Sequence, residues 1–215
     1  MKSRLEVVLY HDALCSWCYL ADARLAVLRE EYGDALDFSY RAFPIRPQDA
    51  LPTAREARLL ARHWRRVAKE PEGAGIVPDL WSSSDPPRST LPPLIALEAA
   101  RVQGASRRDA LLGALREAAF KRGINVARRD VLIELGERVG LEMGRFLAAL
   151  GAPATEEAVR SEHQEARSRG VRGVPALVLG GEWLVSGARP LSEYRELLAT
   201  YLTRRHGSVS ERLLH

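Results

Sequence analysis

The two cysteines of the chain, Cys15 and Cys18, form a single C-x-x-C between an apolar run and a helical run. Residues 5–10 are short, apolar and partly β-branched, which is typical of a strand buried on both faces. Residues 19–32 carry apolar side chains at helical spacing. We therefore predict a strand, a turn that carries the dithiol, and a helix that places both sulfurs on one face.

This position favours redox chemistry over a purely structural role. The first N–H groups of a helix lack intrahelical partners and lie at the positive end of the helix dipole, so they stabilise a thiolate over a thiol. The thiolate is the reactive form in disulfide exchange. Cys15 is therefore the candidate nucleophile and Cys18 the candidate resolving thiol. Two buried, unreactive cysteines are the common alternative, but chance seldom gives both cysteines of a chain this spacing in this setting.

Two polar side chains directly before the motif are candidates for proton transfer during exchange. His11 and Asp12 lie close enough in the sequence to act as a general base. The alternative for both is a polar strand end in water. A zinc site is less favoured, because zinc takes about four ligands. His11 and His63 are available, but there is no second C-x-x-C and no H-x₃₋₅-H, so we expect no metal.

The charged residues are interleaved along the chain rather than grouped. There are 32 Lys and Arg against 28 Asp and Glu, which gives a net charge of +4. Paired arginines such as Arg65-Arg66, Arg107-Arg108 and Arg128-Arg129 lie on predicted helices, where solvated faces are the favoured interpretation. The chain has no aromatic–basic RNA motif and no zinc-finger spacing. We therefore expect no nucleic-acid partner.

The apolar runs bear on where the protein works. The N-terminal run is about six residues long, too short for the core of a secretion signal. No run approaches the roughly 18 apolar residues of a membrane span. If the printed sequence is the full gene product, we expect a cytoplasmic protein with no membrane partner. In the cytosol a C-x-x-C is more often catalytic or redox-sensing than a structural disulfide.

The chain divides into two outer α/β segments and a helical middle. Residues 36–40 alternate apolar and polar side chains, so a second strand completes a βαβ unit. The helical block is too long for an ordinary crossover. We predict an α/β domain made of residues 1–50 and 170–215, with residues 51–169 as a large all-helical insertion. The predicted helices of the insertion are 55–69, 94–102, 111–120, 131–139, 142–150 and 155–168, and 71–93 is predicted mainly as loop.

Strand signals return near the C-terminal end, at residues 174–179 and 183–185. Gly180-Gly181 between them predicts a hairpin. A proline at the first residue of a buried strand removes a ladder donor, so Pro175 needs a reason. Because an X-Pro bond tolerates the cis form, we hypothesise a cis Val174–Pro175 bond beside Cys15 that offers the Val174 N–H and C=O to an extended substrate. A strand-edge proline is the plainer alternative.

The two outer segments resemble a known family. Residues 11–19, HDALCSWCY, and residues 173–176, GVPA, with residues 180–189 resemble the DsbA family of the thioredoxin-like superfamily. Within it they are most similar to the FrnE-type branch, which groups with 2-hydroxychromene-2-carboxylate isomerases. The helical block matches that family in size and class rather than by motif. The resemblance implies a thioredoxin-like fold with a helical insertion before the Val-Pro hairpin.

The resemblance also implies roles for individual residues. Cys15 would be the exposed nucleophile that forms a mixed disulfide, and Cys18 the buried resolving thiol. Pro175 would be the cis-proline that faces them. Ser16 and Trp17 would tune the redox potential, and Trp17 would offer an apolar face to the substrate. The Ser-Trp pair differs from the Pro-His of the periplasmic oxidases, so a strongly oxidising potential is not implied.

Three functions are compatible with these features. The favoured one is a cytosolic thiol–disulfide oxidoreductase that acts on protein thiols or on small thiols such as glutathione, with the dithiol and no resident cofactor. The second is a glutathione-dependent isomerase or kappa-type transferase, although those relatives carry serine where Cys15 stands. The third is a noncatalytic holdase or partner-binding protein that uses the apolar surface around Trp17. The sequence gives no indication of the oligomeric state.

Overall fold

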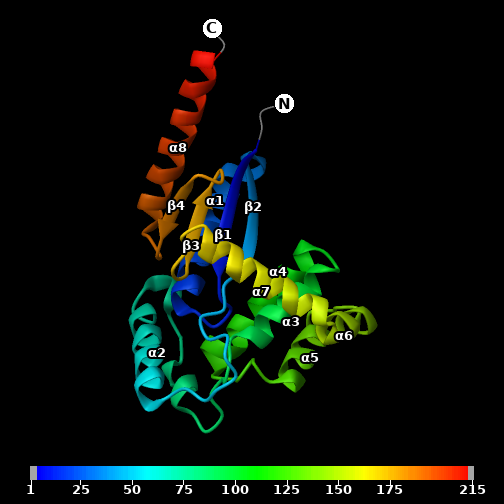
Figure 1. Ribbon diagram of the computed structural model, residues 1–215. Helices are drawn as coiled ribbons and strands as arrows, with labels where there is room; N and C mark the ends of the chain where they lie inside the picture. Colours follow the sequence, from blue (N-terminus) through cyan, green and yellow to red (C-terminus); the bar gives the residue numbers. More distant parts are fainter. Residues whose placement is uncertain (1–3, 213–215) are drawn as a thin grey trace.

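The computed structural model describes residues 4–212, and the side chains of residues 4–204. A mixed sheet with strand order β2-β1-β3-β4 forms its centre (Figure 1). Strand β1 (Leu5–His11) pairs parallel with β2 (Leu36–Ala42) and antiparallel with β3 (Ala176–Leu179). Strand β4 (Trp183–Ser186) pairs antiparallel with β3. The start and the end of the chain therefore build one sheet.

The strand register brings the C-terminal hairpin to the dithiol. Tyr10, near the end of β1, lies opposite Ala176, the first residue of β3. The segment before β3 consequently meets the turn that follows β1. Because β3 begins at Ala176 rather than at Val174, Pro175 precedes the strand and takes no place in its ladder. The lost N–H of a proline costs nothing there.

A glycine fixes the turn of this hairpin. Gly180 has a φ of +57°, in the left-handed region, and a Cβ at this position would lie 1.8 Å from the hydroxyl oxygen of Tyr201. Only glycine fits both the conformation and the space. The predicted turn between β3 and β4 is thus also the point where the hairpin packs on the last helix.

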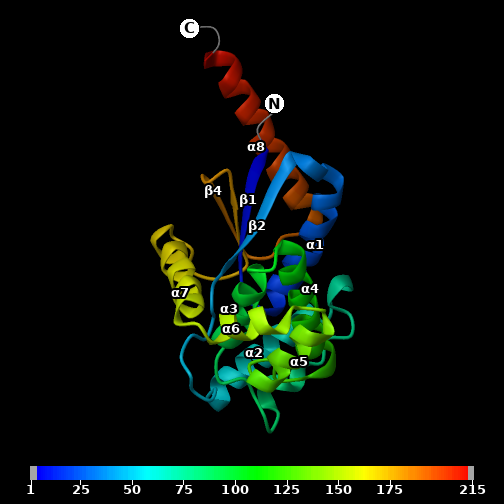
Figure 2. The same cartoon turned by 90° about the vertical axis from the view of Figure 1, so that its right-hand side faces the viewer.

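Helices cover both faces of the sheet (Figure 2). On one face, α1 (Ser16–Tyr32) and α8 (Leu191–Arg212) pack on β1 through an apolar cluster. On the other face, α7 (Pro153–Ser168) places Ala166 against Val8, Tyr10 and Val178. Strand β1 is buried between these layers, as its continuous apolar run predicts. The last helix of the predicted insertion therefore serves as a cover of the sheet.

The remaining helices form a second core below the sheet. They are α2 (Ala54–Val67), α3 (Leu91–Arg101), α4 (Ala105–Arg116), α5 (Arg129–Arg138) and α6 (Met143–Gly151). Aromatic rings hold the centre of this block, where Trp64 lies 6.2 Å from Trp81 and 4.4 Å from Phe120 between ring centroids. Short turns of 3₁₀ or π-helix lie between the helices at Pro71–Gly73, Pro78–Ser82 and Glu117–Lys121, and a further 3₁₀ turn at Gly33–Ala35 leads from α1 to β2.

The α/β thioredoxin-like fold with its helical insertion is confirmed, but two helix starts were predicted too late. Helix α3 begins at Leu91, because Pro92 and Pro93 lie in its first turn, where a missing N–H is tolerated. Helix α4 begins at Ala105, since its first turns carry polar side chains that contribute little to an apolar periodicity. In the described part of the chain, no helix combines the length and the apolar character that crossing a bilayer requires.

One charge prediction was also wrong. Arg107-Arg108 was interpreted as a solvated helix surface, yet Arg108 is only 9% exposed while Arg107 is exposed. Neighbouring residues on a helix point about 100° apart, so one of two adjacent arginines faces water and the other the interior.

Candidate active site at the dithiol

Cys15 is the N-cap residue of α1. Its backbone is extended, with φ −83° and ψ 111°, and its Sγ accepts a hydrogen bond from the N–H of Cys18 at 3.3 Å. The thiol donates to the carbonyl oxygen of Val174 at 3.6 Å. The Val174–Pro175 peptide bond is cis. The sulfur of Cys15 therefore lies between the amides of α1 and the loop that enters β3. The sequence-based hypothesis had placed this loop beside Cys15.

Cys18 is buried one turn deeper, and its side chain is 0% exposed. Burial raises the pKa of its thiol well above the ordinary value, and the hydrogen bond and charge of Cys15 raise it further. Both cysteines are free thiols in this structure. The arrangement is asymmetric: the sulfur of Cys15 accepts a helix N–H, while burial favours the protonated form of Cys18.

Cys15 opens into a cleft of about 230 Å³. Helix α2 forms one wall of this cleft, which explains why Cys15 is only 7% exposed. The expectation of an exposed nucleophile is therefore corrected, because a substrate reaches the sulfur only through the cleft. The residues that line it are mostly apolar: Leu14, Cys15, Ser16, Trp17, Ile45, Leu59, Leu60, His63, Trp64 and Val174.

Trp17 and His63 close one side of the cleft together. The indole Nε1 of Trp17 donates to Nδ1 of His63 at 3.0 Å. Burial, followed by the charges of Arg66 and Arg62, lowers the pKa of His63, so the ring is neutral with its proton on Nε2. The sequence suggested His63 only as a metal ligand. Its real partner is 46 positions away, and no local pattern signals such a pair.

Ser16 and Pro175, two other predicted site residues, are both buried. The side chain of Ser16 lines the cleft, and its Oγ has no hydrogen-bond partner within the described part of the chain. Pro175 accepts a backbone hydrogen bond from Gly187 at 2.8 Å, which ties the loop to the far end of the hairpin. Ser16 thus contributes a buried hydroxyl to the wall of the cleft, whereas Pro175 shapes the loop that carries Val174.

Asp12 is fully buried beneath the turn that carries the cysteines. Its carboxylate accepts the N–H of Leu14 at 2.7 Å and the N–H of Ile45 at 2.8 Å. Burial raises the pKa of this carboxyl to about 6, although these hydrogen bonds oppose the rise. The Asp12 charge also raises the pKa of Cys18. Asp12 therefore acts on the resolving thiol through its charge.

His11 is the predicted site residue that the structure places elsewhere. Its ring lies 5.1 Å from that of Tyr40 and lines a different cavity, next to Arg108. Burial, then the charges of Arg116 and Arg108, lower the pKa of His11. Since β1 turns His11 toward β2, the ring does not line the dithiol cleft. Within residues 4–212, no group of three or more His, Cys, Asp or Glu side chains gathers as a metal site.

Comparisons with known proteins agree with this geometry. The chain is 28% identical over 214 residues to the ClpXP adapter protein SpxH of Halalkalibacterium halodurans, over 94% of the chain and 69% of the relative. It shares its fold with the cytosolic disulfide reductase DsbM of Pseudomonas aeruginosa, solved with GSH, at a TM-score of 0.71 and 24% identity, over 92% and 99% of the two chains. A 2-hydroxychromene-2-carboxylate isomerase has a TM-score of 0.67 at 22% identity, over 95% and 98%.

The family assignment rests on a match along most of the chain. The model of the DSBA-like thioredoxin domain matches residues 6–199. This range includes both outer segments and the helical block between them. The chain therefore belongs to the DsbA-like thioredoxin family.

Proposed function

We propose that the protein is a thiol–disulfide oxidoreductase that works through a mixed disulfide on Cys15. The asymmetry of the two thiols is the observation that carries this proposal. Cys15 lines the cleft, and its Sγ accepts a hydrogen bond from a helix N–H. Cys18 is fully buried, and the pKa of its thiol is raised. Exchange needs one ready thiolate and one thiol that reacts only afterwards.

In the reducing direction, the Cys15–Cys18 dithiol reduces a substrate disulfide in two exchange steps. The Cys15 thiolate attacks a substrate disulfide, so one S–S bond forms as another breaks, and the leaving sulfur takes up a proton. Asp12 accepts the proton of Cys18, and the new thiolate attacks the Sγ of Cys15. The substrate leaves with two thiols, and the Cys15–Cys18 disulfide retains the oxidation. Two molecules of a thiol such as glutathione return the protein to the dithiol by the reverse steps and leave as one disulfide.

The cleft supports a substrate with an extended apolar segment. Its walls are mainly aliphatic and aromatic, and the Val174 carbonyl lies beside the reactive sulfur. Once Cys15 is in a mixed disulfide, it no longer donates to that carbonyl, and a backbone N–H of a bound polypeptide would donate to it instead. Glutathione as the small thiol, and a cytosolic location, follow from the resemblance and from the description of the disulfide reductase. Ser16 and Trp17 would make the first contacts with either substrate.

Two serine variants test the mechanism. In an insulin-reduction assay with glutathione or dithiothreitol, Cys15→Ser is expected to lose exchange by at least about 10³-fold, because the attacking sulfur is gone. Cys18→Ser keeps the attack but lacks the resolving step, so mixed disulfides accumulate and are visible by mass spectrometry. Full activity in Cys15→Ser would overturn the proposal.

A second candidate function is partner binding without redox chemistry. The 28% identity to an adapter protein supports it, as does the apolar cleft next to Trp17. This function predicts that a client binds equally well to the wild type and to the double variant Cys15→Ser, Cys18→Ser. A glutathione-dependent isomerase is less supported, since cysteine occupies position 15. It would bind glutathione at the cleft without oxidising it.

A further inference from the structure

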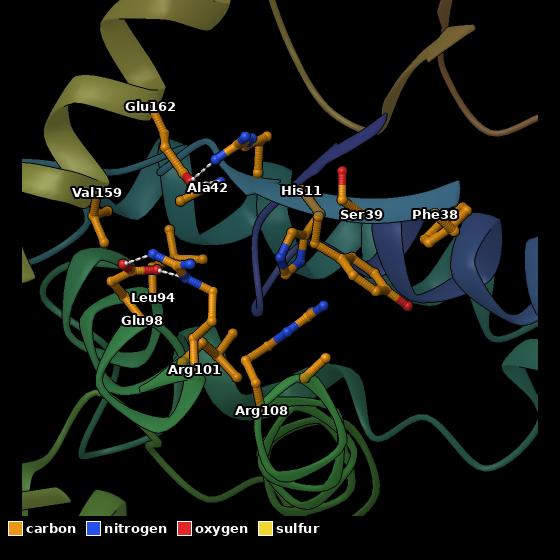
Figure 3. Close-up of a pocket in the computed structure, with 14 residues that line it drawn as sticks. His11, Phe38, Ser39, Ala42, Leu94, Glu98, Arg101, Arg108, Val159 and Glu162 are labelled. Carbon is orange, nitrogen blue, oxygen red and sulfur yellow. Dashed lines mark hydrogen bonds and ion pairs between the residues drawn. The ribbon is translucent and has the colours of Figure 1, made fainter. Parts of the chain in front are cut away.

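A second cavity lies beside the edge of the sheet, between β2 and helices α3, α4 and α7 (Figure 3). Its volume is about 220 Å³. Among the described residues, none lines both this cavity and the dithiol cleft. The cleft is mostly apolar, whereas this cavity carries charged side chains on several walls. The charged residues and the histidine that line it are His11, Arg41, Glu98, Arg101, Arg108 and Glu162.

The carboxylates of this cavity are already engaged. Glu98 accepts from Arg101 on the same helix, through both of its oxygens. Glu162 accepts from Arg41 at 2.8 Å and from the backbone N–H of Ala42 at 2.6 Å. Figure 3 shows both interactions along the walls. Each oxygen of these two carboxylates therefore already accepts one hydrogen bond, and none of these bonds comes from His11 or Arg108.

Arg108 is the deepest of the arginines. Its guanidinium lies over the ring of Tyr40, 3.9 Å from the ring centroid, and its Nη2 pairs with Asp109 at 2.9 Å. Its Nη1 is buried and has no hydrogen-bond partner within the described residues. A guanidinium is always charged, so this N–H group is a buried cationic donor without an acceptor.

His11 presents a second unused nitrogen to the same space. The residue is 3% exposed, and its Nδ1 has no partner in the described part of the chain. Figure 3 shows the ring facing the cavity above Arg108. Arg116, which bonds Asp22 next to Tyr40, has two more unpartnered nitrogens, Nε and Nη2. Buried polar groups nearly always have partners, so this cluster indicates that something absent from the protein chain completes it.

We propose that this cavity binds a small oxyanion, a carboxylate or a phosphate, with its oxygens on the Nη1 group of Arg108 and the ring N–H of His11. The flat fork of arginine matches both oxyanions. Glu162 and Glu98 offset the charges of Arg41 and Arg101, so the lining keeps a net positive charge through Arg108. A water occupies about 30 Å³ of liquid, so the volume suits an ion of this class with a few waters.

The test uses the reduced full-length protein and two probes, inorganic phosphate and succinate, titrated by calorimetry at constant ionic strength set with chloride. Saturable one-to-one binding of either probe is expected, and the preferred probe identifies the source of the oxyanion. Arg108→Gln should weaken binding at least tenfold, because it removes the charged donor. Arg107→Gln is the matched control, since this neighbour donates to the carbonyl of Val139 outside the cavity. It should change affinity by less than twofold.

A second variant guards against loss of folding. The side chain of Arg101 is 60% exposed, so Arg101→Gln should leave the unfolding midpoint unchanged. It should still weaken binding about two- to fivefold, since it removes a positive charge and frees the Glu98 carboxylate. The double variant Cys15→Ser, Cys18→Ser should bind as the wild type does, which separates this site from the proposed redox function. No saturable binding to the wild type, or equal weakening by Arg107→Gln and Arg108→Gln, would overturn the proposal.

Discussion

The dithiol cleft and the cavity lined by Arg41, Arg101 and Arg108 begin three residues apart in the sequence, at Leu14 and His11, yet their linings differ in character. The cleft is mostly apolar and contains the sulfur of Cys15, whose partner thiol is buried. The cavity is lined by several charged side chains and by two residues, His11 and Arg108, that each have a buried nitrogen without a partner among the described residues. In the proposed function, the reactivity of Cys15 would come from its place at the start of α1. Recognition in the cavity would come from charges contributed by several elements.

One buried residue influences both regions. Arg116 pairs with Asp22 of α1, and both side chains are nearly inaccessible. Its positive charge is among the causes that lower the pKa of His11, beside the cavity. The same charge interacts with Cys18, beneath the cleft. The charge of Arg116 therefore acts on both the cleft and the cavity, and substitutions of Arg116 and Asp22 test its effect on both.

The largest expected effect is on stability and follows from removing this shared cation. Arg116→Met leaves the Asp22 carboxylate buried without its ion pair, which typically costs about 3–5 kcal/mol. The double variant Asp22→Asn, Arg116→Met removes the stranded charge as well and should recover most of that loss. Urea unfolding at pH 7 measures both. A loss below about 1 kcal/mol in the free energy of unfolding of the single variant would show that the Asp22–Arg116 pair contributes no more than a surface ion pair.

The next effect concerns Asp12 and the pH dependence of stability. Burial raises the pKa of Asp12 from 3.8 to about 6, so between these values the folded state binds a proton that the unfolded state does not. The free energy of unfolding should therefore rise as the pH falls from about 7 to 4, by about 3 kcal/mol for this group. Asp12→Asn removes this contribution.

The control for this prediction is the difference between wild type and Asp12→Asn at each pH. The lowered pKa of His11 acts in the opposite direction, because below pH 6.5 the unfolded state takes up the proton. Both proteins contain His11, so the difference isolates Asp12. Parallel pH profiles for the two proteins would mean that the carboxyl titrates normally and is a poor proton acceptor for Cys18.

The smallest effect concerns the wall of the cleft. Trp17→Ala removes an apolar surface beside Cys15, so KM for a peptide disulfide should rise about five- to tenfold. The rate with hydroxyethyl disulfide, which is too small to use that wall, should stay within about twofold. Trp183→Ala is the matched control, because Trp183 lies on β4 outside the cleft. Equal effects on both substrates would assign Trp17 to the structure of the turn.

The sequence predicted the cleft better than the cavity, for a physical reason. The strand, the C-x-x-C and the helix are consecutive, so hydrophobic period and spacing were enough to place Cys15 and Cys18. The proline and the family resemblance were the grounds for placing the Val174 loop beside these cysteines. His63 and Arg108 were missed because their partners, Trp17 and Tyr40, are distant in the sequence. Only tertiary packing decides which of two adjacent arginines turns inward.

The most direct test of the central claim is the rate at which each thiol is alkylated. The reduced, folded protein would be treated with limiting iodoacetamide at neutral pH, and the adducts mapped by mass spectrometry. The account predicts that Cys15 is labelled at least about 100-fold faster than Cys18, because only its sulfur is stabilised by helix amides and opens into the cleft. Equal labelling of the two cysteines, or faster labelling of Cys18, would contradict it.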